Sequence, residues 1–155
     1  MTSAQCTFCR IAAGDLDAHL IFEDADFLAF LDHRPLFAGH CLLVPRQHRE
    51  TVLDLPPELG GALFAHVQRL SRAVELGMKA DGFFLAVNNR VSQSVPHVHV
   101  HVVPRRKKDG LKGFFWPRYK YQDEEEMSRT RGAIVAALAM GPSPEGVRVS
   151  EGPKG

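Results

Sequence analysis

Three histidines at alternate positions are the residues of this chain best suited to chemistry. His97, His99 and His101 are separated by single valines in the segment 96–104. Near neutral pH an imidazole can act as a nucleophile, as a proton donor or acceptor, or as a metal ligand. A period of two is typical of a β-strand, so the pattern predicts that the imidazoles share one face of a sheet. A strand rises about 3.3 Å per residue, which places His97 and His101 roughly 13 Å apart, so we expect the three rings to have different roles.

A pair of cysteines near the N-terminus has the spacing of half a metal site. The two-residue gap between Cys6 and Cys9 lets both thiolates bind one zinc ion, but a structural zinc site needs four protein ligands. His48 and His97 are the candidates for the other two. We therefore expect a structural Zn²⁺ site that fastens the N-terminus to the sheet. The same Cys-x-x-Cys spacing is also compatible with a redox pair or with a site that has lost its metal.

A polar loop precedes the histidines. It begins at Asn88 and contains Gln93 and Ser94, each of which can donate a hydrogen bond. Polar side chains at the end of a strand, beside candidate nucleophiles, suit the binding of an oxyanion. The alternative reading is an ordinary loop between two strands.

Composition favours one globular domain and gives no argument for a nucleic-acid or membrane partner. The chain has 155 residues, is 45% hydrophobic and carries a formal net charge of +1. One core is expected over residues 1–140, and no strong basic bias points to nucleic acid or to a membrane. Neither an export leader nor a long apolar run is apparent, so we expect a cytoplasmic protein. Three cysteines argue against a disulfide framework, and Cys41 in its apolar run is expected to be a small buried hydrophobe.

The elements that must position these residues can be read from periodicity and turn residues. Apolar residues at helical spacing predict a long helix that Asp54 caps and that ends near Lys79, and a second helix spans 122–140. Strands are expected at 19–23, 27–31, 41–44, 83–89 and in the histidine segment. The fold class is therefore α+β, with a mainly antiparallel sheet of about five strands, one long helix and one C-terminal helix. The breaker-rich tail 141–155 is expected to be disordered.

Several of these segments together resemble one family. The run His-Val-His-Val-His-Val-Val from His97 is similar to the signature of the histidine triad (HIT) nucleotide hydrolases and transferases. The resemblance extends over 6–116 and includes, in the family's order, Cys-Thr-Phe-Cys-Arg-Ile-Ala-Ala-Gly ending at Gly14, Phe-Glu-Asp ending at Asp24, Leu-Ala-Phe-Leu-Asp ending at Asp32, Gly-His ending at His40, Val-Pro-Arg-Gln-His ending at His48, Val-Asn-Asn ending at Asn89 and Gln-Ser-Val-Pro-His ending at His97.

The resemblance implies a mechanism and a set of site residues. His99 is implied to attack the α-phosphorus of a purine nucleotide conjugate and to form a covalent nucleotidyl-histidine that water or another acceptor resolves. His97 is implied to orient the site and, in zinc-bearing members, to bind the metal. The implied contacts to the nucleotide are Asn88, Gln93, Ser94 and His101 around the phosphates, Asp32 at the ribose, and Phe8, Ile11 and Phe30 around the base. Similar proteins commonly form homodimers through a helix and a sheet edge.

The chain departs from the family pattern beside the triad. Ser92 stands where the family usually has glycine, and the loop from Asn88 to Gln93 is shorter than usual. These departures leave the leaving group and the length of the phosphate chain open. Beyond the triad, the basic run 105–108 with Lys112 either steers anionic substrates or forms a solvated loop. Trp116, in an aromatic cluster, either packs in a core or interface or covers the substrate.

Two other functions fit the same residues. One is a metal-dependent hydrolase in which His97, His99 and a carboxylate hold a zinc ion that activates water. The other is a nucleotide-binding regulatory module with little turnover, for which the serine at position 92 is an argument. Chelation and the search for a protein-bound nucleotide distinguish these alternatives from covalent catalysis.

Overall fold

The computed structural model describes residues 5–111 and 119–138. The chain divides into two compact units at the boundary between residues 112 and 113. Trp116, Lys112 and the predicted tail lie outside the described residues. Of the second unit the structure describes one helix, α3 (Glu124–Leu138), which begins where Asp123 accepts a hydrogen bond from the Glu126 amide at 2.7 Å. This helix bears out the predicted C-terminal helix.

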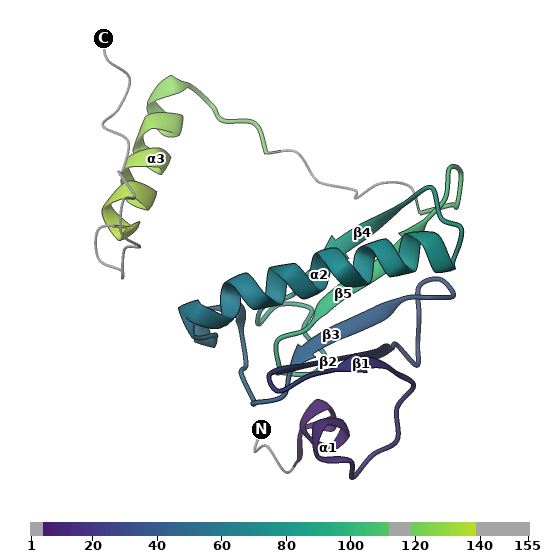
Figure 1. Ribbon diagram of the computed structural model, residues 1–155. Helices are drawn as coiled ribbons and strands as arrows, with labels where there is room; N and C mark the ends of the chain where they lie inside the picture. The colour runs from purple at the N-terminus through teal and green to yellow at the C-terminus, as the bar shows by residue number, and fades with distance from the viewer. Residues whose placement is uncertain (1–4, 112–118, 139–155) are drawn as a thin grey trace. The chain divides into compact units, whose positions relative to one another are not determined.

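The first unit is built on a five-stranded antiparallel sheet, as the alternating apolar segments predict (Figure 1). The strand order is β1-β2-β3-β5-β4, and every neighbouring pair is antiparallel. The strands are β1 (Leu20–Glu23), β2 (Phe27–Leu31), β3 (Cys41–Pro45), β4 (Gly82–Ala86) and β5 (Val100–Arg105). With the long helix and α3, this arrangement confirms the predicted α+β fold class.

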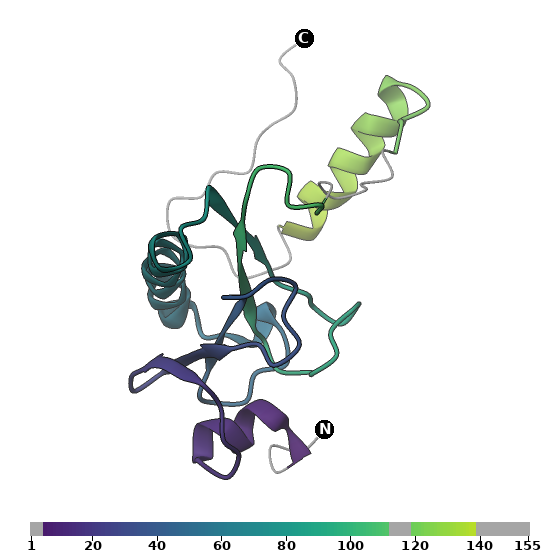
Figure 2. The same ribbon diagram turned by 90° about the vertical axis from the view of Figure 1, so that its right-hand side faces the viewer.

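The long helix α2 (Pro57–Gly77) covers one face of the sheet (Figure 2). Its buried residues Leu63, Val67, Leu70 and Val74 recur every three or four positions, which places them on one side of the helix. They pack against side chains of the sheet that alternate with those of the opposite face, namely Phe27, Ala29, Cys41, Leu43, Val100 and Val102. None of the helices among the described residues is long and apolar enough to cross a membrane.

The start of α2 differs from the prediction. Asp54 does not cap α2, because it belongs to a separate 3-10 turn, η2 (Val52–Asp54). There Asp54 accepts the Thr51 amide at 2.8 Å, while the Thr51 side chain accepts the Leu53 amide, so the pair forms a capping box. Pro56 precedes α2 and Pro57 occupies its first turn, where proline loses no intrahelical hydrogen bond.

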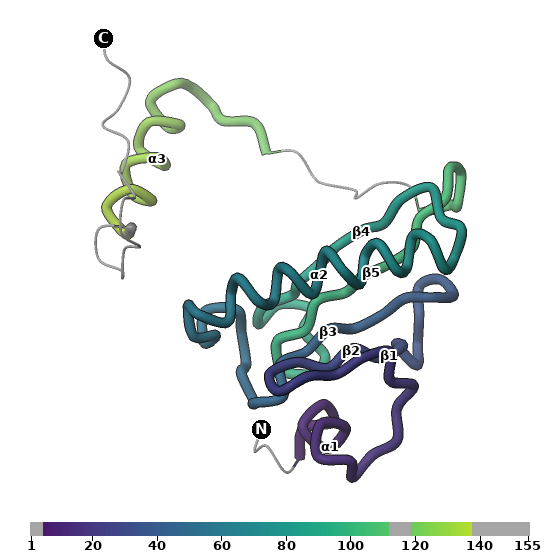
Figure 3. Tube along the Cα trace, in the orientation of Figure 1, coloured from purple at the N-terminus to yellow at the C-terminus, as the bar shows by residue number. Residues whose placement is uncertain are grey.

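The opposite face of the sheet carries α1 (Thr7–Ala13), a helix that the sequence reading did not predict. Figure 3 traces the chain from this helix into β1. Gly14 ends the helix with φ 81°, the left-handed conformation that glycine adopts without strain. Phe8 of α1 joins Cys6 in a second apolar cluster, whose sheet residues are Leu28, Phe30, Leu42 and Val44. The face opposite α2 therefore receives the N-terminal segment, and β5 places His101 there beside Leu42.

The histidine segment is a strand only in its second half. β5 begins at Val100, so His97 and His99 lie in the irregular segment before it. The cause is a tertiary hydrogen bond: the Val98 amide donates to the Arg49 carbonyl at 2.7 Å instead of joining the β-ladder. Val98 is nevertheless 1% exposed, as the alternation predicts.

The loop before the histidines contains two side-chain-bearing residues in the left-handed region. Arg90 has φ 67° and Ser92 has φ 57°. An L-residue in this conformation is disfavoured by about 1–2 kcal/mol, because its Cβ approaches the following carbonyl oxygen. Ser92 stands at the position where the family that this sequence resembles usually has glycine. The backbone there adopts a left-handed conformation that glycine tolerates better than serine.

We expect Ser92→Gly to raise the free energy of unfolding by about 0.5–1 kcal/mol, since relief of the left-handed strain exceeds the added entropy of the unfolded chain. Denaturant titration measures the change. Ser94→Gly is the matched control, because Ser94 does not have a positive φ, and it should stabilise nothing. Equal losses of stability in both variants would contradict the strain at Ser92.

Candidate functional site

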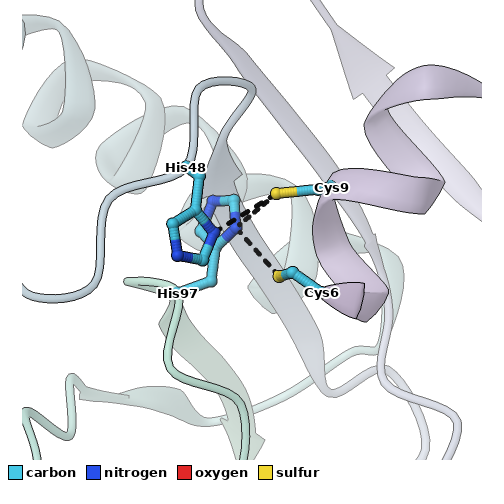
Figure 4. Close-up of side chains that lie close together, drawn as sticks. All are labelled: Cys6, Cys9, His48 and His97. Atoms are coloured by element: carbon cyan, nitrogen blue, oxygen red, sulfur yellow. Dashed lines mark hydrogen bonds between the residues drawn. The ribbon is translucent and has the colours of Figure 1, made fainter. Parts of the chain in front are cut away.

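Four candidate metal ligands converge from three parts of the chain (Figure 4). Cys6 and Cys9 come from the start of α1, His48 follows β3, and His97 precedes β5. Their donor atoms all lie within 4.8 Å of one another. Nδ1 of His97 lies 3.4 Å from the Cys6 sulfur, and Nδ1 of His48 lies 3.3 Å from the Cys9 sulfur. These are the four residues that the spacing of cysteines and histidines predicted.

The geometry of this cluster fits a tetrahedral zinc ion. With Zn–S bonds of about 2.3 Å and Zn–N bonds of about 2.1 Å, a tetrahedron places sulfur and nitrogen ligands about 3.5 Å apart. The sulfur of Cys9 lies 3.5 Å from Nδ1 of His97, and the Cys6–His97 and Cys9–His48 distances between sulfur and Nδ1 are within 0.2 Å of that value at 3.4 and 3.3 Å. Burial raises the pKa of Cys9 to about 11, so a metal ion must displace a thiol proton there.

The ring of His97 is prepared for metal binding by its second nitrogen. Nε2 lies 2.9 Å from the Pro45 carbonyl oxygen, which can only accept, so Nε2 carries the proton and Nδ1 keeps its lone pair. A hydrogen bond of this kind from the distal nitrogen orients metal-binding histidines. His97 is fully buried, and burial, more than the neighbouring histidines, lowers its pKa to about 4. The ring is therefore neutral at physiological pH.

The backbone of the same residue holds the next histidine. Nδ1 of His99 donates to the His97 carbonyl oxygen at 2.7 Å, so the free lone pair of the neutral ring is on Nε2. His99 is 4% exposed, and the Phe8 ring meets it edge to face with centroids 5.2 Å apart. A neutral imidazole fixed in one tautomer and one orientation is suited to nucleophilic attack through Nε2.

His101 stands at the end of a chain of hydrogen bonds. The Leu36 amide donates to Nδ1 of His40 at 3.2 Å, which leaves the proton of that ring on Nε2. Nε2 of His40 then donates to Nδ1 of His101 at 3.0 Å, so the neutral His101 ring carries its own proton on Nε2. Burial, with smaller contributions from His99 and His40, lowers the pKa of His101 to about 4. The His99 and His101 rings lie side by side, with centroids 4.8 Å apart.

Asp32 lies beside this chain of histidines. Its Oδ1 accepts the Arg34 amide at 2.8 Å, and its Oδ2 lies 3.6 Å from Nδ1 of His40. Asp32, His40 and His101 also form a second group whose donor atoms lie within 4.8 Å of one another. The three apolar residues expected around a base gather nearby: Phe8 and Phe30 are buried with centroids 5.6 Å apart, and Ile11 packs against their cluster.

Comparison with known proteins identifies the family. The HIT domain matches residues 13–108 of this chain. The chain belongs to the HIT family. An uncharacterized HIT-like protein of Mycobacterium tuberculosis is 42% identical over 108 residues, which cover 68% of this chain and 75% of the relative. The adenosine 5'-monophosphoramidase of Schizosaccharomyces pombe is 32% identical over 122 residues, which cover 77% of this chain and 89% of that protein.

Solved structures of HIT proteins share the fold. A HIT family member from Bacillus subtilis superposes with a TM-score of 0.77 at 32% identity and covers 91% of this chain and 99% of its own. A zinc-bound histidine triad protein from Mycobacterium smegmatis superposes with a TM-score of 0.66 at 38% identity and covers 90% and 100%. An adenylylsulfatase of Arabidopsis thaliana is 35% identical over 108 residues, which cover 68% of this chain and 55% of the relative.

Two of the loop residues expected at the phosphates of a HIT substrate make hydrogen bonds to the protein's own backbone. The Asn88 amide donates to the Ser92 carbonyl at 3.2 Å, and the Gln93 amide donates to the Glu50 carbonyl at 2.6 Å. Both side chains thus secure the loop itself. Ser94 is exposed, between the loop and the triad.

Two residues of the basic run 105–108, Arg105 and Arg106, are engaged within the protein through their side chains. Arg105 forms a two-pronged pair with Asp109 at 2.6 and 3.0 Å, and this pair holds the pKa of Asp109 well below its usual range. Arg106 donates to the Met78 carbonyl oxygen at 2.6 Å. These contacts indicate that the two arginines stabilise the loop rather than steer substrates.

His40 is the functional candidate that the sequence reading left without a role. It is 3% exposed, and its partner His101 lies 61 positions further along the chain. Only the match of the Gly-His pair to the HIT pattern pointed to it, because the sequence alone does not show that the two rings meet.

We expect Cys6→Ser to abolish stoichiometric zinc binding and to lower the free energy of unfolding by about 3 kcal/mol at zinc concentrations near one hundred times Kd. Zinc content and denaturant titration measure the two effects. Cys41→Ser is the matched control, because the Cys41 thiol lies outside the cluster and donates to the Gly39 carbonyl oxygen. That variant should keep its zinc. Unchanged stability in Cys6→Ser, with zinc absent from the wild type, would contradict the metal site.

Proposed function

We propose that this HIT protein hydrolyses or transfers nucleotidyl groups through a covalent intermediate on His99. The observation that carries the proposal is the 2.7 Å hydrogen bond from Nδ1 of His99 to the His97 carbonyl oxygen. It leaves Nε2 as the nucleophilic atom of this buried ring. A nucleophile whose orientation is already fixed does not pay the entropic cost of becoming oriented in the transition state.

The proposed reaction has two displacements at the α-phosphorus. In the first, Nε2 of His99 forms a bond to phosphorus, and the bond to the leaving group breaks with its electron pair going to that group. In the second, water attacks phosphorus, the phosphorus–nitrogen bond breaks, and its electron pair returns to His99. The two protons of water end on the leaving group and in solution, and a nucleoside monophosphate is released. Another acceptor in place of water makes the reaction a transfer.

His101 is proposed to stabilise the phosphoryl oxygens. The hydrogen-bond chain through His40 supports this role, because it directs the proton of His101 to Nε2. Removal of a single such donor from an oxyanion site typically lowers kcat about 10²- to 10³-fold. Asn88, Gln93 and Ser94 are proposed to complete the phosphate site once substrate replaces their contacts within the loop, and Asp32 to bind the ribose hydroxyls.

The proposed substrates are purine nucleotide conjugates with an adenylyl group. Two relatives carry the names adenylylsulfatase and adenosine 5'-monophosphoramidase, which share that group and differ in what is attached to it. Phe8, Ile11 and Phe30 are proposed to form the apolar wall against the base, with Trp116 as a further contact. Dinucleoside polyphosphates are the third substrate class to be tested.

The cluster of Cys6, Cys9, His48 and His97 is proposed to bind a structural zinc ion. The sulfur–nitrogen distances and the proton on Nε2 of His97 support it, as does the zinc-bound relative from Mycobacterium smegmatis. When bound, zinc would cross-link the N-terminal segment to His48 and His97. It would carry no catalytic water, because the protein provides all four ligands. His97 then links the metal to the nucleophile.

A metal-activated hydrolase remains the second candidate, in a form that differs from the sequence-based one. Nδ1 of His97 faces the cysteines, and Nδ1 of His99 is hydrogen-bonded to a carbonyl oxygen. These two rings therefore do not converge on one metal ion. The group that favours this candidate is Asp32, His40 and His101. It predicts that chelators abolish turnover in a protein that keeps its fold, without any protein-bound nucleotide. A regulatory module would instead bind nucleotide with little turnover.

We expect an adenylyl adduct on wild-type protein after rapid quenching with an adenosine phosphoramidate, and none on His99→Ala. The variant should lose at least about 10³-fold in turnover, since it lacks the nucleophile, while nucleotide binding remains. Intact-protein mass spectrometry under non-acidic conditions measures the adduct, because a phosphorus–nitrogen bond is labile in acid. Turnover near wild type in His99→Ala would overturn the assignment, and nucleotide binding without any adduct would favour the second candidate or the regulatory module.

The homodimer implied by the resemblance is proposed to form along α2 and β4. β4 is an edge of the sheet, so one side of its backbone is not paired within the sheet. Beside it runs an apolar groove of about 400 Å³ between the two elements, bordered by Phe64, which is 64% exposed, and Val87, which is 38% exposed. A second copy related by a twofold axis satisfies both features, because it offers the same edge and the same apolar residues.

Phe64→Glu is expected to shift the protein from dimer to monomer, because it places a charge in the proposed interface. Analytical ultracentrifugation gives the molecular mass. Ile21→Glu is the matched control, since Ile21 is 43% exposed on β1 at the opposite edge of the sheet. A monomeric wild type, or a dimer that only Ile21→Glu disrupts, would contradict this interface.

A further inference from the structure

We propose that Cys6 and Cys9 are a site of reversible oxidation, at which a hydroperoxide converts the metal-binding pair to a disulfide and thereby disables the nucleophile. The proposal rests on the zinc site and on His99 catalysis as proposed above. It concerns what else the same two sulfur atoms can do, and it takes up the redox reading that the Cys-x-x-Cys spacing allows.

The position of the two cysteines at the start of α1 suits a disulfide. Cys6 is the N-cap of α1 and Cys9 lies in its first turn, where the Arg10 amide bonds the Cys6 carbonyl at 3.0 Å. Residues three apart in a helix have Cα atoms about 5 Å apart. Disulfides form across Cα separations of roughly 4.4–6.8 Å, so this spacing permits closure.

The two thiols differ in access, which sets the order of events. Cys6 is 0% exposed, whereas Cys9 is partly exposed at the side of the cluster. In the zinc-loaded protein, where both cysteines are thiolates, a hydroperoxide therefore transfers an oxygen atom to the Cys9 sulfur first, which gives a sulfenic acid and releases water or an alcohol. The Cys6 sulfur then attacks the Cys9 sulfur, a sulfur–sulfur bond forms, and the sulfenic oxygen leaves as a second water. Peroxide is reduced and the two thiols are oxidised, with a net loss of two hydrogen atoms.

Disulfide formation removes half of the metal ligands at once. A thiolate binds zinc, but a disulfide sulfur does not do so effectively. His48 and His97 alone do not complete a tetrahedral site. Zinc is therefore released in proportion to the disulfide formed.

The nucleophile responds because two residues of this region contact it directly. Phe8 lies between the two cysteines in α1, and its ring meets His99 with centroids 5.2 Å apart and His97 at 5.8 Å. The His97 carbonyl oxygen holds Nδ1 of His99. Release of the His97 ring from the metal loosens the residue whose backbone fixes the nucleophile, and displacement of α1 moves the aromatic ring that packs against it. Adduct formation on His99 is expected to slow by about tenfold or more in the oxidised protein.

The test treats zinc-loaded full-length protein with hydrogen peroxide and follows mass, zinc and adduct formation. We expect a loss of about 2 Da per chain. Zinc released to a chromogenic chelator should match that loss in extent, adenylyl transfer to His99 should slow, and dithiothreitol with zinc should restore all three. Cys41→Ser should behave as wild type, whereas Cys9→Ser should show no loss of 2 Da.

The contrary outcomes are distinct. Stable addition of oxygen to Cys9 without the loss of 2 Da, or retention of zinc after disulfide formation, would overturn the proposal. An adduct rate that does not change in the disulfide form would remove its link to catalysis. Absence of zinc before oxidation would contradict the proposed metal site, and absence of any adduct in reduced protein would contradict the proposed function, so each failure can be assigned.

Discussion

One residue, His97, connects the two halves of the site. Its ring donates to the Pro45 carbonyl oxygen and turns Nδ1 toward the thiols of Cys6 and Cys9, while its own carbonyl oxygen accepts a hydrogen bond from Nδ1 of His99. The side chain thus serves the metal cluster and the backbone serves the nucleophile. Any displacement of His97 changes both, so the order of the N-terminal segment and the chemistry of the triad depend on the same few atoms.

The sheet positions these atoms by separating two different environments, one on each of its faces. One face packs against α2 through an apolar cluster, and the other combines a second apolar cluster under α1 with the histidines. The buried imidazoles are each held by at least one hydrogen bond, as the chain from Leu36 through His40 to His101 illustrates. The same burial lowers the pKa of His97 and His101 to about 4, which keeps positive charge on these two rings away from the nucleophile.

Local patterns predicted much of this arrangement. Alternation and turn residues located the strands, and the spacing of Cys6 and Cys9 together with His48 and His97 named the cluster that the fold assembles. These signals succeeded because period and ligand spacing are properties of short segments. The catalytic and nucleotide-binding roles of the individual site residues stay predictions.

Long-range contacts account for what the patterns missed. The seven-residue helix α1 is too short to show a clear period, and it is held by its packing with Phe30 and Leu42. Val98 leaves the β-ladder for the Arg49 carbonyl oxygen, a partner 49 positions away, so β5 starts three residues after His97. His40 finds His101 across 61 positions. No local rule contains these pairings.

The protonated nitrogen of each histidine ring can be identified by long-range ¹H–¹⁵N correlation spectroscopy, with signals assigned from variants in which one histidine at a time is replaced. The spectrum reports which nitrogen of each neutral ring carries the proton. The account predicts the proton of His99 on Nδ1 and that of His101 on Nε2, which leaves Nε2 of His99 free to attack phosphorus. A proton on Nε2 of the neutral His99 ring would contradict this assignment, because the nucleophilic atom would then have no free lone pair.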